Sequence, residues 1–326
     1  MNIKDVAKNC GVSIATVSRV LNGTSYVSPE LVERVLNSVE KLGYKPSKIA
    51  QSLRKGETYN IGFLVPDISN MFFSSIIKGA NSVLENEGYI IFLCNSYGDR
   101  KKEVKLLEKL FISGIDGLIV VPIDIHNNFI DFMTYKKIKV LVIDEIINKK
   151  NISSIASDNY NGMIELIDYL YVNGHSSFIF LSGNPSTFSA RKRTKAFEDK
   201  MRDLKINDFK IILGEYTYES GVKMAKKIEK IPDAIVCGND MIAFGVINQL
   251  KRNGFRIPED VSVTGFDDVI FSSMVRPSLT TVKQDPYEMG RAGGQLMLKM
   301  LKGKEKNEIR LLKTKLEIRE STCGRK

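Results

Sequence analysis

Hydrophobic residues recur along this chain with two different spacings. From Ile3 to Leu42 they follow the three- and four-residue spacing of amphipathic helices, whereas from Tyr59 onward short apolar runs alternate with helical segments. The change predicts a small helical module followed by a larger α/β region. A chain of 326 residues is long enough for two or three domains with buried cores.

The first helical pair is predicted within residues 3–22. Val6 faces inward from the first helix, Gly11 takes the left-handed backbone that the turn needs, and Ser13 caps the second helix. Val17 then returns at helical spacing to pack against the first helix. The exposed face would carry Ile14, Ala15, Thr16 and Arg19. An ordinary helical hairpin would share this pattern, but the glycine, the cap and the inward residues together favour a helix-turn-helix that reads DNA.

A third helix is predicted directly after this pair. Ser28, Pro29 and Glu30 are typical of a helix start, and Gly43 is typical of a helix end. Six apolar residues are expected on one face of this helix, namely Leu31, Val32, Val35, Leu36, Val39 and Leu42. The result is a three-helix headpiece over residues 1–45, a size common among DNA-binding modules.

Residues 46–58 form a short helical pattern between Pro46 and Gly56. So short a helix is marginal alone in water. One interpretation is a plain linker. The other is a hinge that becomes helical when bound, in which Ile49 and Leu53 pack against a second copy or enter a minor groove. The residues alone leave both open.

The α/β region begins at Tyr59. Strands are predicted at residues 61–65, 89–94, 117–122, 140–144, 178–183, 210–214, 234–237, 261–266 and 316–320. Helices are predicted at residues 73–87, 101–113, 162–173, 241–253 and 288–300. This alternation favours parallel sheets covered on both faces, which bind ligands at the carboxyl ends of their strands. Polar residues gather there: Asp67, Ser69, Asn70, Asp144, Asn239, Asp240, Asp267 and Asp268.

The composition of the chain indicates which kinds of partner it binds and in which cellular compartment it acts. The net charge is +10, and residues 1–59 hold nine Lys and Arg against five Asp and Glu, so the excess is densest in the predicted DNA-binding part. Four scattered cysteines without CxxC spacing indicate a reducing compartment. No apolar run approaches the length of a membrane span, and no signal segment precedes the first helix. We therefore expect a soluble cytoplasmic protein without membrane contact.

An enzyme is the main rival interpretation, because parallel α/β sheets often host catalysis. The chain has two histidines, His126 and His175, and neither lies in a Ser-His-Asp or metal-ligand motif. The glycines at residues 290–294 lack dinucleotide-binding spacing, and no GxxxxGK motif occurs. We expect no catalytic site, no metal and no cofactor.

Several motifs together identify a family. They include IKDVA at residues 3–7, VSRVLN at 17–22, PDISN at 66–70, IPEDVS at 257–262, GFDD at 265–268 and PSLTTV at 277–282. In this order they make the chain similar, over nearly its whole length, to the LacI/GalR family of bacterial transcriptional regulators. The resemblance implies a helix-turn-helix headpiece, a hinge helix, and a core of two parallel-sheet subdomains like the periplasmic sugar-binding proteins.

The resemblance also implies a division of the chain. The headpiece would span residues 1–45, the hinge helix and linker 46–58, and the core 59–326. Within the core, an N-subdomain would comprise residues 59–158 and 285–312, and a C-subdomain residues 159–284 and 313–326.

Family members bind palindromic double-stranded operator DNA as dimers. The residues matching DNA-contact positions are Ser13, Ile14, Ala15, Thr16, Arg19, Ala50 and Leu53, with Leu53 as the wedge into the central base step. The resemblance thus favours the DNA-binding interpretation of the hinge. Since no leucine heptad follows the last strand, we expect a homodimer and not a tetramer.

The resemblance implies a small-molecule effector in the core, which we expect to be a monosaccharide such as a pentose that controls a repressor. The positions matching the sugar cleft are Asn70, Phe72, Phe73, Asp144, Arg193, Tyr216, Asn239, Asp267 and Gln284. Two departures matter: Glu145 replaces an arginine of the ribose branch, and Thr187 replaces a ligand arginine of a purine-sensing member. Alternatively, Phe72 and Phe73 are core residues and Asn239 is a helix cap.

A second candidate function is a catabolite-control regulator whose corepressor is a seryl-phosphorylated carrier protein. That branch carries a phosphoserine-binding arginine in the helix predicted at residues 288–300. Here Gln295 stands at that position, and Arg291 lies one turn earlier.

Overall fold

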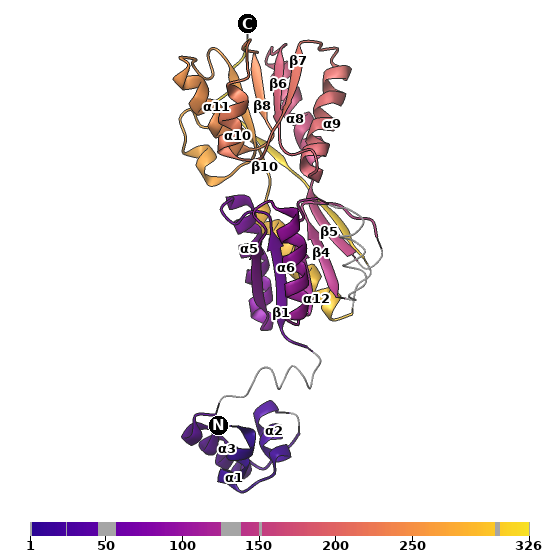
Figure 1. Cartoon of the computed structure of the whole chain (residues 1–326), viewed down its shortest axis with the longest axis vertical. Coiled ribbons are helices and arrows are strands. Elements are labelled where there is room, and N and C mark those ends of the chain that lie inside the picture. Colours follow the sequence, from indigo (N-terminus) through magenta and orange to yellow (C-terminus); the bar gives the residue numbers. More distant parts are fainter. Residues whose placement is uncertain are drawn as a thin grey trace. The chain divides into compact units, whose positions relative to one another are not determined.

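The structure is a computed structural model that describes residues 2–23, 25–44, 57–124, 138–149, 152–303 and 307–325. The chain divides into two compact units, Met1–Thr58 and Tyr59–Lys326, and each is described by itself (Figure 1). The predicted hinge contacts Ala50 and Leu53 lie outside the described residues, and so does His126.

The first unit contains the three predicted helices, α1 (Ile3–Cys10), α2 (Ile14–Asn22) and α3 (Pro29–Leu42). Gly11 has a φ of 64°, as the turn between α1 and α2 requires, and the Ser13 hydroxyl accepts a hydrogen bond from the Thr16 N–H at 3.1 Å. The fully buried core side chains are Val6, Ala7, Cys10, Val17 and Val35.

Two details of α3 differ from the prediction. Leu36 is 49% exposed, because it lies about 100° around the helix from Val35 and so outside the buried stripe. Ser28 occupies the N-cap position, but its side chain makes no capping hydrogen bond. The helix still begins at Pro29, whose fixed φ suits the first helical position.

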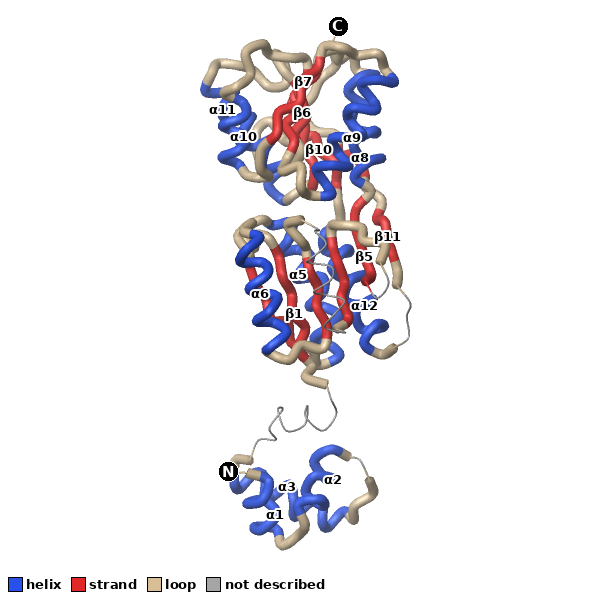
Figure 2. The backbone as a smooth tube through the Cα atoms, turned by 45° about the vertical axis from the view of Figure 1, so that its right-hand side comes forward, coloured by secondary structure: helices blue, strands red, loops and turns tan. Residues whose placement is uncertain are grey.

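The second unit is built on two six-stranded sheets (Figure 2). In the first sheet the strand order is β11 (Ile309–Leu312), β5 (Ile152–Ser157), β4 (Lys139–Ile143), β3 (Gly117–Val120), β1 (Asn60–Val65) and β2 (Ile90–Asn95). In the second sheet the order is β12 (Lys315–Glu317), β10 (Thr280–Lys283), β9 (Ser262–Asp267), β8 (Ala234–Cys237), β6 (Phe178–Ser182) and β7 (Phe209–Leu213). All neighbours are parallel except β10 and β12.

The chain passes between the two sheets three times. These passages lie at Asp158, between β5 and the following helix, at Gln284–Asp285 after β10, and at Lys313–Thr314 between β11 and β12. Each sheet with its helices therefore forms a subdomain assembled from segments that are distant in sequence. Three adjacent chain segments connect the two subdomains.

Helices cover both faces of each sheet. They are α5 (Met71–Leu84), α6 (Arg100–Ile112) and α12 (Pro286–Leu301) on the first sheet, and α8 (Asn159–Val172), α9 (Phe188–Asp203), α10 (Tyr218–Ala225) and α11 (Asp240–Arg252) on the second. Short 3₁₀ turns follow at η1 (Glu85–Glu87) and η2 (Ile270–Ser273). Separate apolar clusters lie on the two faces of each sheet. The predicted α/β class is thus confirmed.

The glycines at residues 290–294 have a packing role. A Cβ on Gly290 would lie 1.9 Å from the Ile76 carbonyl oxygen, and a Cβ on Gly79 would lie 2.0 Å from the Tyr287 carbonyl oxygen. Helices α5 and α12 can therefore approach closely only because these positions lack side chains.

Several elements were not predicted from the sequence. Strand β5 contains three serines, and α9 is dominated by charged residues, so neither shows the expected apolar pattern. Strands β10 and β11 and helix α10 are short and were also missed. In addition, the edge strand β2 exposes Ile90, Phe92 and Leu93, so the expectation that both faces of every strand are covered is wrong there.

Candidate functional site

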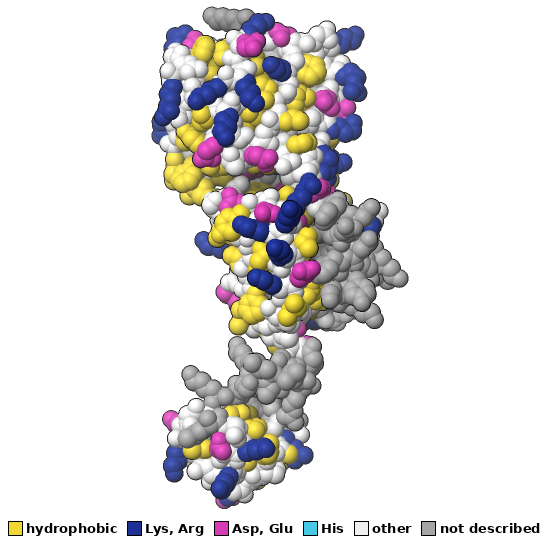
Figure 3. Space-filling model, in the orientation of Figure 1, with side chains coloured by type: hydrophobic (Ala, Val, Ile, Leu, Met, Phe, Trp, Pro, Cys, Tyr) yellow, Lys and Arg dark blue, Asp and Glu magenta, His cyan; other side chains and the backbone are white. Residues whose placement is uncertain are grey.

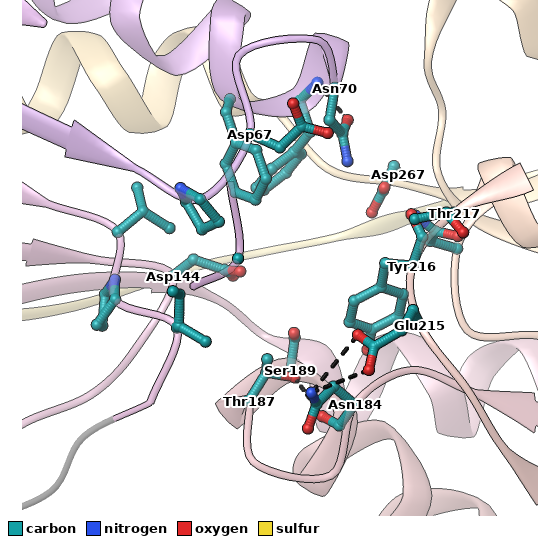
Figure 4. Close-up of a pocket in the computed structure, with 18 of the residues that line it drawn as sticks. Asp67, Asn70, Asp144, Asn184, Thr187, Ser189, Glu215, Tyr216, Thr217 and Asp267 are labelled. Carbon is teal, nitrogen blue, oxygen red and sulfur yellow. Dashed lines mark hydrogen bonds between the residues drawn. The ribbon is translucent and has the colours of Figure 1, made fainter. Parts of the chain in front are cut away.

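A cavity of about 760 Å³ lies between the two subdomains of the second unit, at the carboxyl ends of the strands. The structure places all nine residues that matched the family's sugar cleft in its lining: Asn70, Phe72, Phe73, Asp144, Arg193, Tyr216, Asn239, Asp267 and Gln284. Figure 4 shows Asp144 and Asn70 on one side of the open space and Tyr216 and Asp267 on the other. That these residues bind an effector stays a prediction.

The aromatic residues contribute unequally to this lining. Phe72 is 4% exposed and belongs to the apolar core beside Ile76, which agrees with the structural alternative. Phe73 is half-buried, and its ring meets that of Phe72 edge-on at a centroid distance of 5.5 Å. Tyr216 is half-buried on the opposite wall. Phe73 and Tyr216 are therefore the rings available to a ligand's apolar face.

Arg193 is the centre of the C-subdomain wall. It is 3% exposed; its Nε donates to Asn159 Oδ1 at 2.8 Å and its Nη1 donates to the Gly238 carbonyl. Its Nη2 lies 3.7 Å from Asp267 Oδ1, and its guanidinium carbon lies 3.7 Å from the centre of the Phe266 ring. A guanidinium held by so many partners is rigid and supplies a fixed positive charge to the wall.

Asp267 lies at the end of β9 with a φ of 129°, an unusual backbone conformation for a residue with a side chain. Gln284 Nε2 donates to its Oδ1 at 2.6 Å. Burial raises the pKa of Asp267 to about 8, although the nearby Arg193 opposes the shift. The carboxyl group is thus close to balanced between its neutral and ionised forms near pH 8.

Asp240 stabilises the turn at Asp267 through hydrogen bonds from neighbouring segments. Its side chain is fully buried, and its Oδ2 accepts from the Val269 N–H at 2.9 Å and from the Ser272 hydroxyl at 2.7 Å. Its Oδ1 accepts from the Thr281 hydroxyl at 2.5 Å. Burial raises the pKa of Asp240, but three donors stabilise its charge. Asp240 therefore joins three segments around Asp267.

Asp144 faces the cavity from the end of β4. It has a φ of 62°, and its Oδ1 is buried without a hydrogen-bond partner. Burial raises the pKa of Asp144 to about 7; Arg193 opposes this shift and Glu145 adds to it. This carboxylate has unused capacity to accept hydrogen bonds.

Glu145 connects the two subdomains. Its Oε2 lies 3.0 Å from Nη2 of Arg191 on α9, so the carboxylate of one subdomain pairs with a guanidinium of the other. Glu145 is 6% exposed, and burial raises its pKa while Arg191 opposes the shift. The residue that departs from the ribose branch thus forms an ion pair across the cleft.

Two asparagines of the lining also cap helices. Asn70 Oδ1 accepts from the Phe72 N–H at 3.0 Å at the start of α5, and Asn239 Oδ1 accepts from the Ile242 N–H at 2.9 Å at the start of α11. Asn239 Nδ2 donates to the Tyr216 carbonyl at 3.4 Å. The alternative role of Asn239 as a cap is therefore confirmed, and it does not conflict with a place in the cavity wall.

Unpaired polar atoms concentrate in the lining. Among the described residues, six buried side-chain polar atoms lack a hydrogen-bond partner, and four of them belong to lining residues: Asn95 Nδ2, Asp144 Oδ1, Tyr216 Oη and Gln284 Oε1. A buried polar atom without a partner is costly. This concentration indicates a site that accepts a polar ligand.

Some lining residues were not predicted. They are Asn95, Tyr97, Asn184, Ser189, Glu215 and Thr217. Asn95 and Tyr97 lie at the end of β2, Asn184 follows β6, and Glu215 follows β7. The rule that ligands bind beyond the carboxyl ends of parallel strands would have found these four if it had been applied to every strand.

The headpiece presents the predicted DNA-contact side chains on α2. Ile14 is 44% exposed, and Ser13, Ala15 and Arg19 are also exposed. Thr16 is half-buried, since its hydroxyl pairs with that of Ser13 at 2.9 Å, so it faces outward only in part. The start of α2 therefore offers a mixed apolar and polar surface, and the Arg19 guanidinium follows in the last turn of the helix.

In the described part of the chain, no group of three or more His, Cys, Asp and Glu side chains is placed to hold a metal ion. His175 is buried, with Nδ1 2.8 Å from the Leu170 carbonyl and Nε2 2.8 Å from the Ser262 hydroxyl, which is a structural role. None of the described helices is long and apolar enough to span a membrane.

Two family descriptions match this chain: "Bacterial regulatory proteins, lacI family" over residues 2–47 and "Periplasmic binding protein-like domain" over residues 167–322. The chain is 32% identical to catabolite control protein A of Priestia megaterium, with 99% of each chain covered. Among solved structures, the Lac repressor dimer bound to operator and the anti-inducer ONPF matches with a TM-score of 0.90 at 26% identity, with 99% of each chain covered. A transcriptional regulator from Enterococcus faecalis V583 with bound ribose matches with a TM-score of 0.76 at 29% identity, covering 82% of this chain and 100% of that one.

Proposed function

Since this chain belongs to the LacI family of bacterial regulatory proteins, we propose that it is a sequence-specific DNA-binding transcriptional repressor controlled by a small carbohydrate. The observation that carries the proposal is the combination of two sites in one chain. The headpiece has a capped recognition helix with an exposed face, and the second unit has a polar cavity between two linked subdomains.

The recognition helix would bind the major groove through Ser13, Ile14, Ala15, Thr16 and Arg19. Ile14 and Ala15 are apolar and exposed, which suits contact with thymine methyl groups, and Arg19 suits hydrogen bonds to guanine. Ala50 and Leu53 would contact the minor groove at the centre of the operator. On the face shown in Figure 3, the Lys and Arg side chains of the α/β unit are interspersed with Asp and Glu. We therefore base the DNA-binding proposal on the side chains of α2 and not on the net charge of the chain.

Operator binding would require two copies of the chain. The edge strand β2 leaves Ile90, Phe92 and Leu93 exposed, and Val104 of α6 is 37% exposed nearby in the same subdomain. An apolar sheet edge favours association with another chain. We propose a homodimer, for which sedimentation equilibrium would give twice the chain mass of 36.7 kDa.

The effector would act through the cavity. Because its lining comes from both subdomains, a ligand that contacts both walls changes how they are held together. Such a ligand shifts the population of DNA-binding forms by its differential affinity, typically by about 1–3 kcal/mol. Phe73 and Tyr216 would cover the apolar face of a sugar ring, and Asn70, Asp144, Arg193 and Asp267 would bind its hydroxyls.

Catabolite control through a phosphorylated carrier protein is the second candidate, supported by the similarity to catabolite control protein A. The structure weakens the case for Arg291, because its Nε and Nη2 donate to both carboxylate oxygens of Glu288 at 2.6 and 2.7 Å. A seryl-phosphate would have to displace this bidentate pair. We therefore favour the small-molecule effector.

The test of DNA binding uses the full-length protein and duplexes selected from a random pool. Arg19→Ala should weaken binding to the selected duplex by about 1–3 kcal/mol, roughly 5- to 150-fold, and leave binding to random DNA nearly unchanged. Arg34→Ala is the matched control, because Arg34 is also exposed but lies on α3. Equal losses in both variants, or no selected duplex at all, would overturn the proposal. Carbohydrate control is tested by adding ligands to the same complex.

A further inference from the structure

The charge of the cavity lining is strongly one-sided. Five lining residues carry carboxyl groups, namely Asp67, Asp144, Glu145, Glu215 and Asp267, and Arg193 is the single Lys or Arg among the described lining residues. In their ionised forms these carboxyl groups repel an anionic ligand and attract a cationic one.

The cations near the cavity are already occupied. Arg193 donates to Asn159 and Gly238 and lies beside Asp267, so each of its three nitrogens already lies near a protein acceptor. Arg191 pairs with Glu145 and also donates to the Ser186 carbonyl. A phosphate or carboxylate entering the cavity would therefore compete with existing pairs for both guanidiniums.

Helix N-termini could in principle attract an anion here, because four helices begin at the cavity. Each of them is capped by a lining side chain that accepts a hydrogen bond from a first-turn N–H: Asn70 in α5, Thr187 in α9, Thr217 in α10 and Asn239 in α11. These caps cover the positive ends of the helices. The helix termini thus do not reverse the preference set by the carboxylates.

The atoms left without partners include two pure acceptors on opposite walls. Asp144 Oδ1 belongs to the N-subdomain and Gln284 Oε1 lies by the C-subdomain residue Asp267, to which Gln284 donates its Nε2. Gln284 is 2% exposed, so its free carbonyl oxygen cannot be satisfied by bulk solvent. Figure 4 shows Asp144 and Asp267 facing each other across the open space. This arrangement calls for a group with several hydrogen-bond donors.

We propose that the effector is a polyhydroxylated molecule carrying a protonated primary amine, that is, an amino sugar, with its ammonium group between Asp144 and Asp267. This inference rests on the proposed effector site and names the chemical class of its ligand. An ammonium group has three donors and no acceptor, which matches unpaired carboxylate and carbonyl oxygens. The hydroxyls would pair with Asn70 and Asn95, and the faces of Phe73 and Tyr216 favour a cation as well as a sugar ring.

The titration of the two carboxyl groups agrees with this geometry. Without a ligand, burial holds the pKa of Asp144 near 7 and that of Asp267 near 8, and the charges facing them are Arg193, Glu145 and Asp240. A bound ammonium group would favour the ionised form of both residues. Binding would then release protons, whereas a neutral sugar would leave both pKa values high.

The test measures binding to the full-length protein by isothermal titration calorimetry at pH 6.5. The probes are glucose, galactose and mannose, each as the neutral sugar, the 2-amino-2-deoxy sugar, the N-acetylated amino sugar and the 6-phosphate. We expect one amino sugar to bind at least about tenfold more tightly than its neutral parent and its N-acetyl form. We expect no binding of the phosphates.

Substitutions in the cavity distinguish the effect of side-chain charge on ligand preference from the effect of side-chain size. Asp144→Asn should bring the affinities of the amino sugar and its neutral parent to within about threefold of each other, because the side chain keeps its size but loses its charge. Asp208→Asn is the matched control, since Asp208 is exposed and pairs with Lys230 outside the lining, and it should keep the full preference. Asp267→Asn, on the other side of the assigned ammonium position, provides a second test and should reduce the same preference.

The outcomes distinguish this inference from the proposed function. If a neutral sugar or a sugar phosphate binds as tightly as the amine, the amine inference is wrong and the carbohydrate effector stands. If the amine preference survives Asp144→Asn, the assigned ammonium position is wrong. If no sugar of any charge binds while selected DNA is still bound, the carbohydrate effector itself fails together with this inference.

Discussion

The headpiece and the α/β unit treat charged side chains in opposite ways. In the described residues of the headpiece, every Lys, Arg, Asp and Glu is exposed, and the core consists of small apolar side chains around Val6 and Val17. Among its described residues, the α/β unit buries five Lys, Arg, Asp or Glu side chains, namely Glu103, Glu145, Arg193, Asp240 and Asp267. Four of these line the cavity or support its wall. Since burying charge is costly, this concentration marks the cavity as the part of the fold shaped for binding.

The helix caps of the headpiece and the polar network around the cavity differ in the range of their hydrogen bonds. In the headpiece the capping bonds join residues two or three positions apart, such as Asn2 with Asp5 and Ser13 with Thr16. Around the cavity, Arg193 bonds to Asn159 and Asp240 bonds to Thr281, pairs separated by 34 and 41 positions. The caps of the headpiece are thus specified locally, although Ser38 on α3 also donates to Asn9 Oδ1 on α1, 29 positions away. The cavity exists only when the whole α/β unit has folded.

The largest expected effect concerns the buried guanidinium of Arg193 and its contribution to the stability of the α/β unit. Arg193→Met should destabilise the α/β unit by about 3–5 kcal/mol, because Asp267, Asn159 and the Gly238 carbonyl would lose a buried partner. Urea unfolding of the full-length protein measures this loss.

Lys195→Met on the same helix is the control for Arg193→Met. Its ammonium group is exposed and pairs with Asp199, so we expect a loss below about 0.5 kcal/mol. Similar losses in the two variants would show that the buried network around Arg193 does not hold the wall together.

The difference between short-range and long-range contacts explains which features could be predicted from the sequence. The turn at Gly11, the cap at Ser13 and the buried Val17 depend on neighbours within a few residues, and all three predictions are confirmed. Local patterns also located most strands of the α/β unit. They failed for β5, whose serines are buried by neighbouring strands and by the backbone of distant segments, which no local pattern contains.

The cavity could be predicted only in outline. Resemblance to the family supplied nine lining positions, and the structure brings all nine together. It did not supply the pairing of Glu145 with Arg191, since these residues are 46 positions apart and belong to different subdomains. The resemblance also could not predict that Asp144 Oδ1 lacks a hydrogen-bond partner, because this depends on every atom around it.

The next prediction tests whether buried carboxyl groups destabilise the ligand-free cavity. The pKa of Asp144 is about 7 in the folded chain and near 4 in an unfolded one, so the folded form binds more protons between these values. Stability should therefore fall as the pH rises from about 4 to 7.

Asp144→Asn removes this dependence, because the amide does not ionise. At pH 8 it should stabilise the ligand-free protein by about 1–2 kcal/mol, seen as a rise in Tm of roughly 2–8 °C by calorimetry. At pH 5 the gain should be much smaller, since most of the cost of ionising Asp144 in the folded protein accumulates between pH 5 and 7. A gain of equal size at both pH values would mean that ionisation of Asp144 is not the cause.

The smallest expected effect tests how much a single helix cap stabilises the headpiece. It compares two serines that occupy equivalent N-cap positions. The Ser13 hydroxyl accepts from the Thr16 N–H, whereas the Ser28 side chain makes no capping bond. Ser13→Ala should therefore destabilise the headpiece by about 0.5–1 kcal/mol, and Ser28→Ala should change it by less than about 0.3 kcal/mol. Hydrogen exchange of the headpiece amides in the full-length protein measures both. Because each cap acts within its own unit, exchange in the α/β unit should stay the same, and an equal change in both units would contradict their independence.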